Sequence, residues 1–176
     1  PASCCGLVGM KPTRARTPMG PDAGEGWSGM SCVHAVSRSV RDNAALLDAV
    51  QGPEPGAPYW APPPERPYLE EVSRPAGRLR IGFQTATFNG APTHPDCVAA
   101  TEDAARLCQE LGHEVSEANL AVDAETLREA TLTIIGGNLR ATLLTRARAL
   151  GREDFGADDV EPTTFLMAAA AAGKGA

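Results

Sequence analysis

Apolar residues recur at intervals of three and four in the segment that begins at Ser39. The Ser39 hydroxyl stands three residues before the Asp42 carboxylate, an arrangement typical of the first turn of a helix. Gly52 followed by Pro53 cannot continue a helix and marks its end. The segment 39–52 is therefore predicted to form a helix with one buried face. The residues expected on that face are Val40, Ala44, Leu47 and Val50.

A strand, a helix and a second strand are predicted in succession over 79–117. The short apolar run 79–83 favours a strand, and Pro95 suits the first turn of a helix that Gly112 ends. The second strand begins at His113. Two strands connected through a helix in this way lie parallel, with a right-handed crossover. Small and apolar residues recur on one face of the helix, which we expect to be buried: Cys97, Thr101, Ala104, Ala105, Cys108 and Leu111.

The segment 1–38 is rich in glycine and yet apolar, without the periodicity of a helix or a strand. Such a segment is typical of loops that pack tightly around a site. The connection 53–78 carries eight prolines, which forbid a long regular element. We expect this connection to lie on the surface, with one helical turn near 68–72.

The remaining segment, 123–176, is predicted to be helical. A first helix is expected to end at Gly151 and is weakened at the Gly136-Gly137 pair. A second helix is expected to begin near Pro162. Helices combined with a strand–helix–strand unit place the chain in the α/β class. All of 1–176 is expected to form part of one domain, and a chain of this length can bury a core.

Composition is ordinary for a soluble globular protein, with 43% apolar and 22% charged residues. The net charge of −6 disfavours binding to nucleic acid. No stretch approaches the roughly 20 apolar residues that cross a bilayer, so no membrane partner is expected. The five cysteines lack the spacing of a metal site or of a disulfide framework, so no metal is expected. We expect free, buried thiols in a reducing compartment, which indicates the cytoplasm.

Two short motifs resemble functional sequences but lack the structural context that those sequences need. The run 24–29 matches G-x-G-x-x-G, which binds dinucleotides only between a strand and the start of a helix. No helix is predicted until Ser39. Ser28 lacks the second glycine of a nucleophile elbow, because that position is Met30. We therefore expect neither a nucleotide site nor a catalytic triad here. The histidines, expected to be structural, are His34, His94 and His113.

The opening residues carry the most specific pattern in the chain. Residues 1–13, PASCCGLVGMKPT, resemble the end of the amidase signature, P-A-x-x-x-G-x-x-G-x-K-P-T. Further matches follow in family order at 37–42, 79–82 and 111–115, and the resemblance extends to about residue 120. Each match alone is modest, but their order along the chain is specific. The chain therefore resembles the amidase signature family of serine hydrolases.

The resemblance implies a large amidase fold in which helices cover a mixed sheet, with this chain truncated at both ends. It also implies a Ser–cis-Ser–Lys triad. The nucleophilic serine would lie four residues before Pro1, and the other two members would lie further upstream. The chain is then expected to contain no catalytic residue and to be inactive alone. Lys11 belongs to the K-P-T stretch, where we expect a buried or paired cation at the turn that Pro12 fixes.

By the same resemblance, the whole protein is expected to hydrolyse amide C–N bonds through an acyl-enzyme. Small cyclic or linear amides are the expected substrates, and no cofactor is expected. The glycine-rich loop 19–31 is expected to line the substrate pocket, with Trp27, Ser28 and Gly29 as substrate-binding residues. Trp27 would form an apolar wall, and packing of Trp27 in the core is the alternative. The expected partner is a small-molecule amide, and homodimer formation is left open.

Three alternatives remain open. An esterase of the same fold would use the same machinery on a different bond. An amidotransferase subunit acting on charged tRNA is disfavoured, because His34 and Ala35 stand where many family members have Gly-Pro. A non-catalytic binding module would result if the whole protein lacked the upstream serines and lysine.

Overall fold

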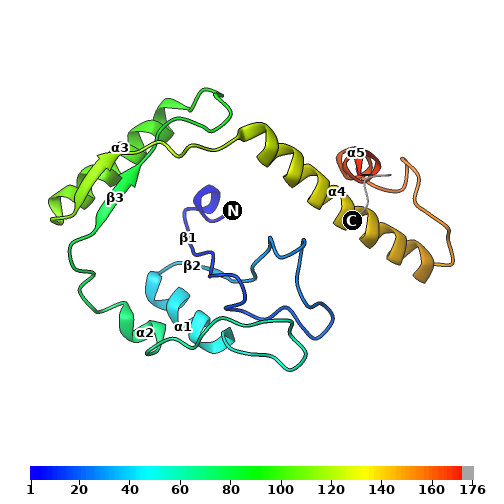
Figure 1. Cartoon of the computed structure of the whole chain (residues 1–176), viewed down its shortest axis with the longest axis horizontal. Coiled ribbons are helices and arrows are strands. Elements are labelled where there is room, and N and C mark those ends of the chain that lie inside the picture. Colours follow the sequence, from blue (N-terminus) through cyan, green and yellow to red (C-terminus); the bar gives the residue numbers. More distant parts are fainter. Residues whose placement is uncertain (172–176) are drawn as a thin grey trace. The chain divides into compact units, whose positions relative to one another are not determined.

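The computed structural model describes residues 1–171, which divide into two compact units (Figure 1). Unit 1 is Pro1–Pro75, and unit 2 begins at Ala76. Residues 172–176, the end of the helical region predicted over 123–176, lie outside the described residues. The assignment of the whole chain, 1–176, to one domain stays a prediction.

Helix α1, Val40–Val50, is the largest regular element of unit 1 and confirms the helix predicted over 39–52. Ser39 is its N-cap, and the Ser39 Oγ accepts a hydrogen bond from the Asp42 backbone N–H at 3.1 Å. This bond satisfies one of the amide groups that the first turn of a helix leaves without a partner. The capping pattern in the sequence therefore located the start of the helix correctly.

The buried face of α1 is shorter than the sequence predicts. Ala44 and Leu47 are buried, with exposed fractions of 8% and 2%. Val40 and Val50, expected on the same face, are 59% and 47% exposed, so this part of the prediction is wrong. The elements of unit 1 that pack on α1 are two very short strands and one helical turn, and they cover only its middle.

Two strands of two residues each pair in unit 1, and the sequence did not predict them. Strands β1, Val8–Gly9, and β2, Val36–Ser37, are antiparallel, and the 3-10 helix η1, Ser3–Cys5, precedes them. Two residues are too few to show the alternation by which a strand is predicted. Without such an alternation, only the structure could reveal this pairing.

Asn43 of α1 holds the segment that leads into β2. Its Nδ2 donates to the Ala35 carbonyl oxygen at 3.1 Å, and its Oδ1 lies 2.9 Å from His34 Nε2. Asn43 is 3% exposed, so these bonds satisfy a buried amide. The structural role expected for His34 is confirmed.

The connection predicted over 53–78 contains one helical turn, α2, Tyr68–Glu71, as expected. Pro67 precedes it and provides no side-chain cap. Instead, the Asp48 carboxylate accepts hydrogen bonds from the Tyr68 and Leu69 backbone N–H groups at 2.7 and 2.8 Å. A carboxylate at a helix N-terminus is favourable, so Asp48 connects α1 to α2.

Unit 2 opens with the predicted strand–helix–strand unit (Figure 1). Strand β3, Arg80–Phe83, and strand β4, Glu114–Glu117, are parallel, and α3, Pro95–Glu110, connects them. Ile81 lies opposite Val115 in the register. The α/β class is confirmed, with one parallel and one antiparallel strand pair among the described residues.

His94 and His113 both bind backbone groups through Nδ1. His94 is the N-cap of α3, and its Nδ1 accepts from the Asp96 N–H at 3.2 Å. The Nδ1 atom of His113 accepts from the Leu79 N–H at the same distance, next to the start of β4. These contacts agree with the structural roles expected for both histidines.

The buried face predicted for α3 is largely wrong in this chain. Ala105 is buried at 8% exposed, whereas Cys97 is exposed and Leu111 is 66% exposed. Two strands of four residues offer too little surface to cover a helix of 16 residues. The expectation of buried thiols fails as well, because no cysteine of this chain is buried. Cys4, Cys5 and Cys97 are exposed, and Cys32 and Cys108 are half-buried.

Two helices follow, as predicted for this region. They are α4, Ala124–Ala149, and α5, Pro162–Ala170, and they pack against each other (Figure 1). The Gly136-Gly137 pair lies inside a continuous α4. Ala147 and Ala168 are buried, at 0% and 3% exposed. Among residues 1–171, no helix combines the length and the apolar character that a membrane span requires.

Candidate functional site

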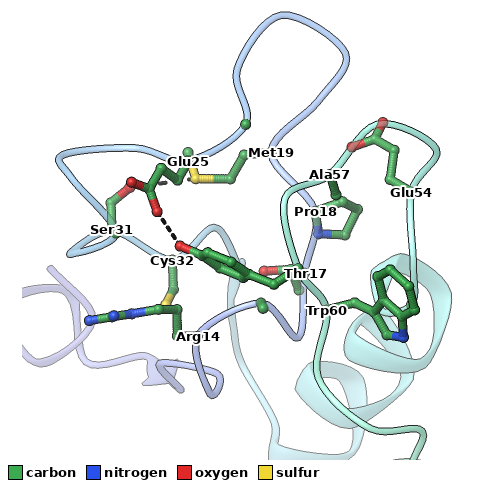
Figure 2. A pocket seen from close by; sticks show the side chains of 15 residues that line it. Arg14, Thr17, Pro18, Met19, Glu25, Ser31, Cys32, Glu54, Ala57 and Trp60 are labelled. Atoms are coloured by element: carbon green, nitrogen blue, oxygen red, sulfur yellow. Dashed lines mark hydrogen bonds between the residues drawn. The ribbon is translucent and has the colours of Figure 1, made fainter.

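A crevice in unit 1 brings together three segments that are separate in the sequence: 14–19, 24–32 and 52–60. Its cavity volume is about 30 Å³, and it is partly open to solvent. Loops of the glycine-rich segment 1–38 form one side, and the proline-rich connection forms the other (Figure 2). The crevice therefore lies in the segment that the sequence predicted to surround a site.

The base of the crevice is fixed by Thr17, which is only 7% exposed. Its Oγ1 donates a hydrogen bond to the Val33 carbonyl oxygen at 2.7 Å, so the two ends of the glycine-rich loop are tied together. The Arg16 carbonyl oxygen accepts from the Gly52 N–H at 3.1 Å, just after α1 ends. These contacts position the loop against the helix.

The tip of the glycine-rich loop is a left-handed turn. Trp27, Ser28 and Gly29 have φ angles of 51°, 53° and 79°. The Gly29 N–H donates to the Gly26 carbonyl oxygen at 3.1 Å, and the Met30 N–H donates to the Trp27 carbonyl oxygen at 3.0 Å. A left-handed conformation costs a residue with a side chain roughly 1–2 kcal/mol. Strain of this kind is concentrated at functional sites.

The three residues predicted to bind substrate lie together in this turn, but they differ in their surroundings. Gly29 is buried and lines the crevice. Trp27 and Ser28 are exposed and belong to the turn without lining the crevice. Trp27 is 47% exposed, so it is not a core residue of unit 1. Its role as an apolar wall of a substrate pocket stays a prediction.

Two aromatic residues that line the crevice, Tyr59 and Trp60, were not predicted from the sequence. They lie in the proline-rich connection, which has no periodicity to mark them as part of a site. An adjacent tyrosine and tryptophan are unusual in a chain with only 5% aromatic residues, and this was the available signal. Tyr59 is 42% exposed and Trp60 is 60% exposed, so both remain accessible.

Glu25, Tyr59 and Arg14 converge on the Cα of Gly29. The Tyr59 hydroxyl donates a hydrogen bond to the Glu25 carboxylate, drawn as a dashed line in Figure 2. A Cβ on Gly29 would lie 3.1 Å from Glu25 Oε2, 3.4 Å from Tyr59 Oη and 3.5 Å from Arg14 Cζ. These three side chains can approach one another here because Gly29 has no side chain.

The hydrogen bond to Glu25 raises the pKa of Tyr59. Partial loss of hydration and the negative charge of Glu25 act in the same direction, while the nearby Arg14 lowers the pKa. The Tyr59 hydroxyl is therefore held as a hydrogen-bond donor at neutral pH. It is suited to binding or positioning and unsuited to acting as a base.

Among residues 1–171, no serine hydroxyl has a histidine as its hydrogen-bond partner. The Ser31 Oγ contacts the Met19 sulfur at 3.6 Å, and the histidine contacts described above go to Asn43 and to backbone amides. Within residues 1–171, no group of three or more potential ligands is placed to hold a metal ion.

Lys11 was expected to be a buried or paired cation at the turn that Pro12 fixes. It is exposed, and its Nζ donates to the Pro12 carbonyl oxygen at 2.8 Å. Pro12 itself is buried, so Lys11 still contacts the turn that Pro12 fixes. Burial, one of the two expected options, is therefore wrong, and a hydrogen bond to a carbonyl oxygen holds Lys11 at the turn.

Comparison with known proteins relates these features to a family. The model of the Amidase family matches residues 1–163. The chain is 37% identical over 171 residues to 6-aminohexanoate-cyclic-dimer hydrolase from Pseudomonas sp. (strain NK87). It is 37% identical over 172 residues to the hydrolase of the same name from Paenarthrobacter ureafaciens. Each alignment covers 95% of this chain and 34% of the relative.

A solved structure gives the same result for the fold. The structure of 6-aminohexanoate cyclic dimer hydrolase complexed with substrate aligns with a TM-score of 0.78 and 34% identity. The alignment covers 98% of this chain and 36% of the hydrolase. The chain thus spans about a third of the length of the relatives it matches. The sequence of the segment 19–34, taken alone, is also similar to that of this hydrolase.

Three observations agree: the motifs in the first 120 residues, the fold of the described residues, and the family match over nearly the whole chain. Since that match extends over 1–163, the chain belongs to the Amidase family.

Proposed function

We propose that the protein of which this chain forms part hydrolyses amide C–N bonds by acyl transfer. The observation that carries the proposal is the Amidase family match over residues 1–163. In this mechanism a serine four residues before Pro1 attacks the amide carbonyl. A lysine acts through a bridging serine as the general base, and backbone N–H groups stabilise the oxyanion. No cofactor takes part.

We propose a small cyclic or linear amide as the substrate, related in chemistry to the 6-aminohexanoate cyclic dimer named for the relatives. The crevice of unit 1 would contribute one side of the substrate pocket. Trp27, Ser28 and Gly29 would contact the substrate from the left-handed turn. The strained backbone of this turn and the position of Gly29 in the crevice support the proposal.

The same proposal makes the 176-residue chain inactive alone, because the serines and the lysine of the triad all lie outside it. We place the protein in the cytoplasm, with neither nucleic acid nor a membrane as a partner, and allow for a homodimer. The competing functions are an esterase, an amidotransferase subunit and a non-catalytic binding module. The following experiment separates an amidase from the esterase and from the binding module.

The experiment measures hydrolysis of 6-aminohexanoate cyclic dimer and of a 4-nitrophenyl ester by the full-length protein. Replacing the serine four residues before Pro1 with alanine should abolish amide hydrolysis. Ser73→Ala is the matched control, since Ser73 is exposed and bonds only to the Glu70 carbonyl oxygen among the described residues. Hydrolysis of the ester alone would favour the esterase, and no hydrolysis of either would favour a binding module. Serine-dependent amide hydrolysis by the isolated chain would overturn the placement of the triad.

A further inference from the structure

The proline-rich strap, residues 53–62, forms one wall of the crevice and is stiff for its length. Four of its ten positions are Pro53, Pro55, Pro58 and Pro62. Each proline fixes its own φ angle and restricts the residue before it. The prolines restrict the backbone of the strap, and contacts at its ends and at its middle hold it in place.

The ends of the strap are held by backbone-directed contacts. Near its start, the Glu54 carboxylate accepts a hydrogen bond from the Gly20 N–H at 2.8 Å. Near its end, the Ala61 N–H donates to the Ala15 carbonyl oxygen at 3.1 Å. These contacts do not involve the loop tip at 24–32, which approaches the strap where Gly24 lies against the ring of Pro58.

A hydrogen bond between side chains also joins the loop tip to the strap. Tyr59 lies between the two anchored ends, and its hydroxyl donates to Glu25 across the crevice. Arg14 lies beside the same cluster, and Gly29 leaves it room. The chain has two tyrosines, and the other one, Tyr68, lies in α2. Tyr59 is therefore the tyrosine whose hydroxyl lies at the crevice.

We propose that Tyr59 is a specificity-determining residue, whose hydrogen bond to Glu25 holds the proline-rich strap against the glycine-rich loop and so limits the width of the amide that the crevice accepts. This inference rests on the proposed function, because it assigns the crevice to the substrate. Tyr59 acts by positioning the strap and takes no part in the chemical step. Loss of the hydroxyl should therefore change KM and substrate ranking, while kcat for a slender substrate stays the same.

The test compares Tyr59→Phe with the wild-type full-length protein. The substrates are the 4-nitroanilides of acetic acid, which is slender, and of cyclohexanecarboxylic acid, which is wide. The ratio of kcat/KM for the wide to the slender anilide should rise about three- to tenfold, the effect expected for loss of one hydrogen bond. Tyr68→Phe removes the same oxygen from α2 and should leave the ratio unchanged.

A second readout does not depend on activity. Amide hydrogen exchange should accelerate in peptides covering 19–31 and 53–62 in Tyr59→Phe, and only there. Glu25→Gln keeps an acceptor oxygen and should show a smaller effect. In the double variant, Tyr59→Phe with Glu25→Gln, the two effects should fall short of additive.

The outcomes separate the two claims. Unchanged hydrogen exchange in Tyr59→Phe would show that the Tyr59–Glu25 hydrogen bond does not hold the strap, whatever the activity. Faster exchange with an unchanged substrate ratio would overturn its role in specificity. If the wild-type protein hydrolyses no amide, the proposed function fails and the specificity role fails with it, while the exchange rates still decide whether Tyr59 holds the strap.

Discussion

Gly136 of α4 lies directly against the backbone of Met167 in α5. A Cβ at Gly136 would be 2.5 Å from the Met167 carbonyl oxygen and 2.8 Å from the Cβ of Ala171. The next residue, Gly137, has no such neighbour within 4 Å. Two adjacent glycines in one helix thus have different roles, and only the first is required for the approach of the two helices.

Gly136→Ala should therefore destabilise the protein, and Gly137→Ala should not. Forcing a methyl group into a close helix contact typically costs about 1–3 kcal/mol. Alanine in a helix with open space around it gains about 0.5–1 kcal/mol over glycine. Thermal unfolding of both variants checks this, with a lower midpoint for Gly136→Ala and an equal or higher one for Gly137→Ala. Equal losses would show that the packing of α4 on α5 does not depend on Gly136.

Asn43→Ala should loosen the junction between α1 and the glycine-rich segment. The change leaves the Ala35 carbonyl oxygen and the His34 ring without the partner they have in the structure. Removing one partner of a buried hydrogen bond costs about 1–3 kcal/mol. Denaturant unfolding should show a loss of this size. Asn119→Ala, at an exposed position, is the control and should change the stability by less than about 0.5 kcal/mol.

Periodicity and capping patterns predicted most elements of the fold correctly. Ser39 located the start of α1, and Pro95 and Pro162 located the starts of α3 and α5. These signals are local, because a cap or a proline acts within one helical turn. The order of the motifs also indicated the family, which the comparison over 1–163 confirmed.

Burial was predicted less well, because it depends on what packs against an element. Cys97 and Leu111 lie on the face of α3 expected to be buried, yet both are exposed among the described residues. The left-handed turn at Trp27 and Ser28 could not be predicted either, since neither residue favours positive φ. Tyr59 and Glu25 are 34 residues apart in the sequence, and no local pattern predicts a contact between them.

The loop between α4 and α5 should lose stability as the pH falls. The hydrogen bond from Arg140 lowers the pKa of Asp154, and the hydrogen bond from Arg152 lowers the pKa of Asp159. A carboxyl whose pKa is lower in the folded state contributes stability above its unfolded value, here 3.8. That contribution is lost as the pH falls through the folded pKa values, so the window lies below about pH 4.

Hydrogen exchange in peptides covering 151–161, measured from pH 6 down to pH 3 and corrected for the intrinsic rate, checks this prediction. Protection should fall in the acid range for the wild-type protein. Asp159→Asn should show lower protection already at pH 6, because it removes the charge that Arg152 binds. Asp158→Asn, at an exposed neighbouring position, is the control. Protection that does not change with pH would contradict a role of these ion pairs in ordering the loop.

Gly29→Ala tests whether the polar cluster of the crevice needs the space that glycine leaves. Gly90→Ala is a close control, because Gly90 has a similar φ of 72° against 79° at Gly29 but has no neighbour within 4 Å of an added Cβ. Both variants should lose about 1 kcal/mol from the left-handed backbone. Gly29→Ala should lose more, since its methyl group would approach Glu25 Oε2 to 3.1 Å and push the carboxylate from Tyr59. In the full-length protein, only Gly29→Ala should change KM for amides. Equal stability and equal KM in the two variants would mean that the polar cluster can accommodate a methyl group. Gly29 would then be required only for the backbone conformation of the turn.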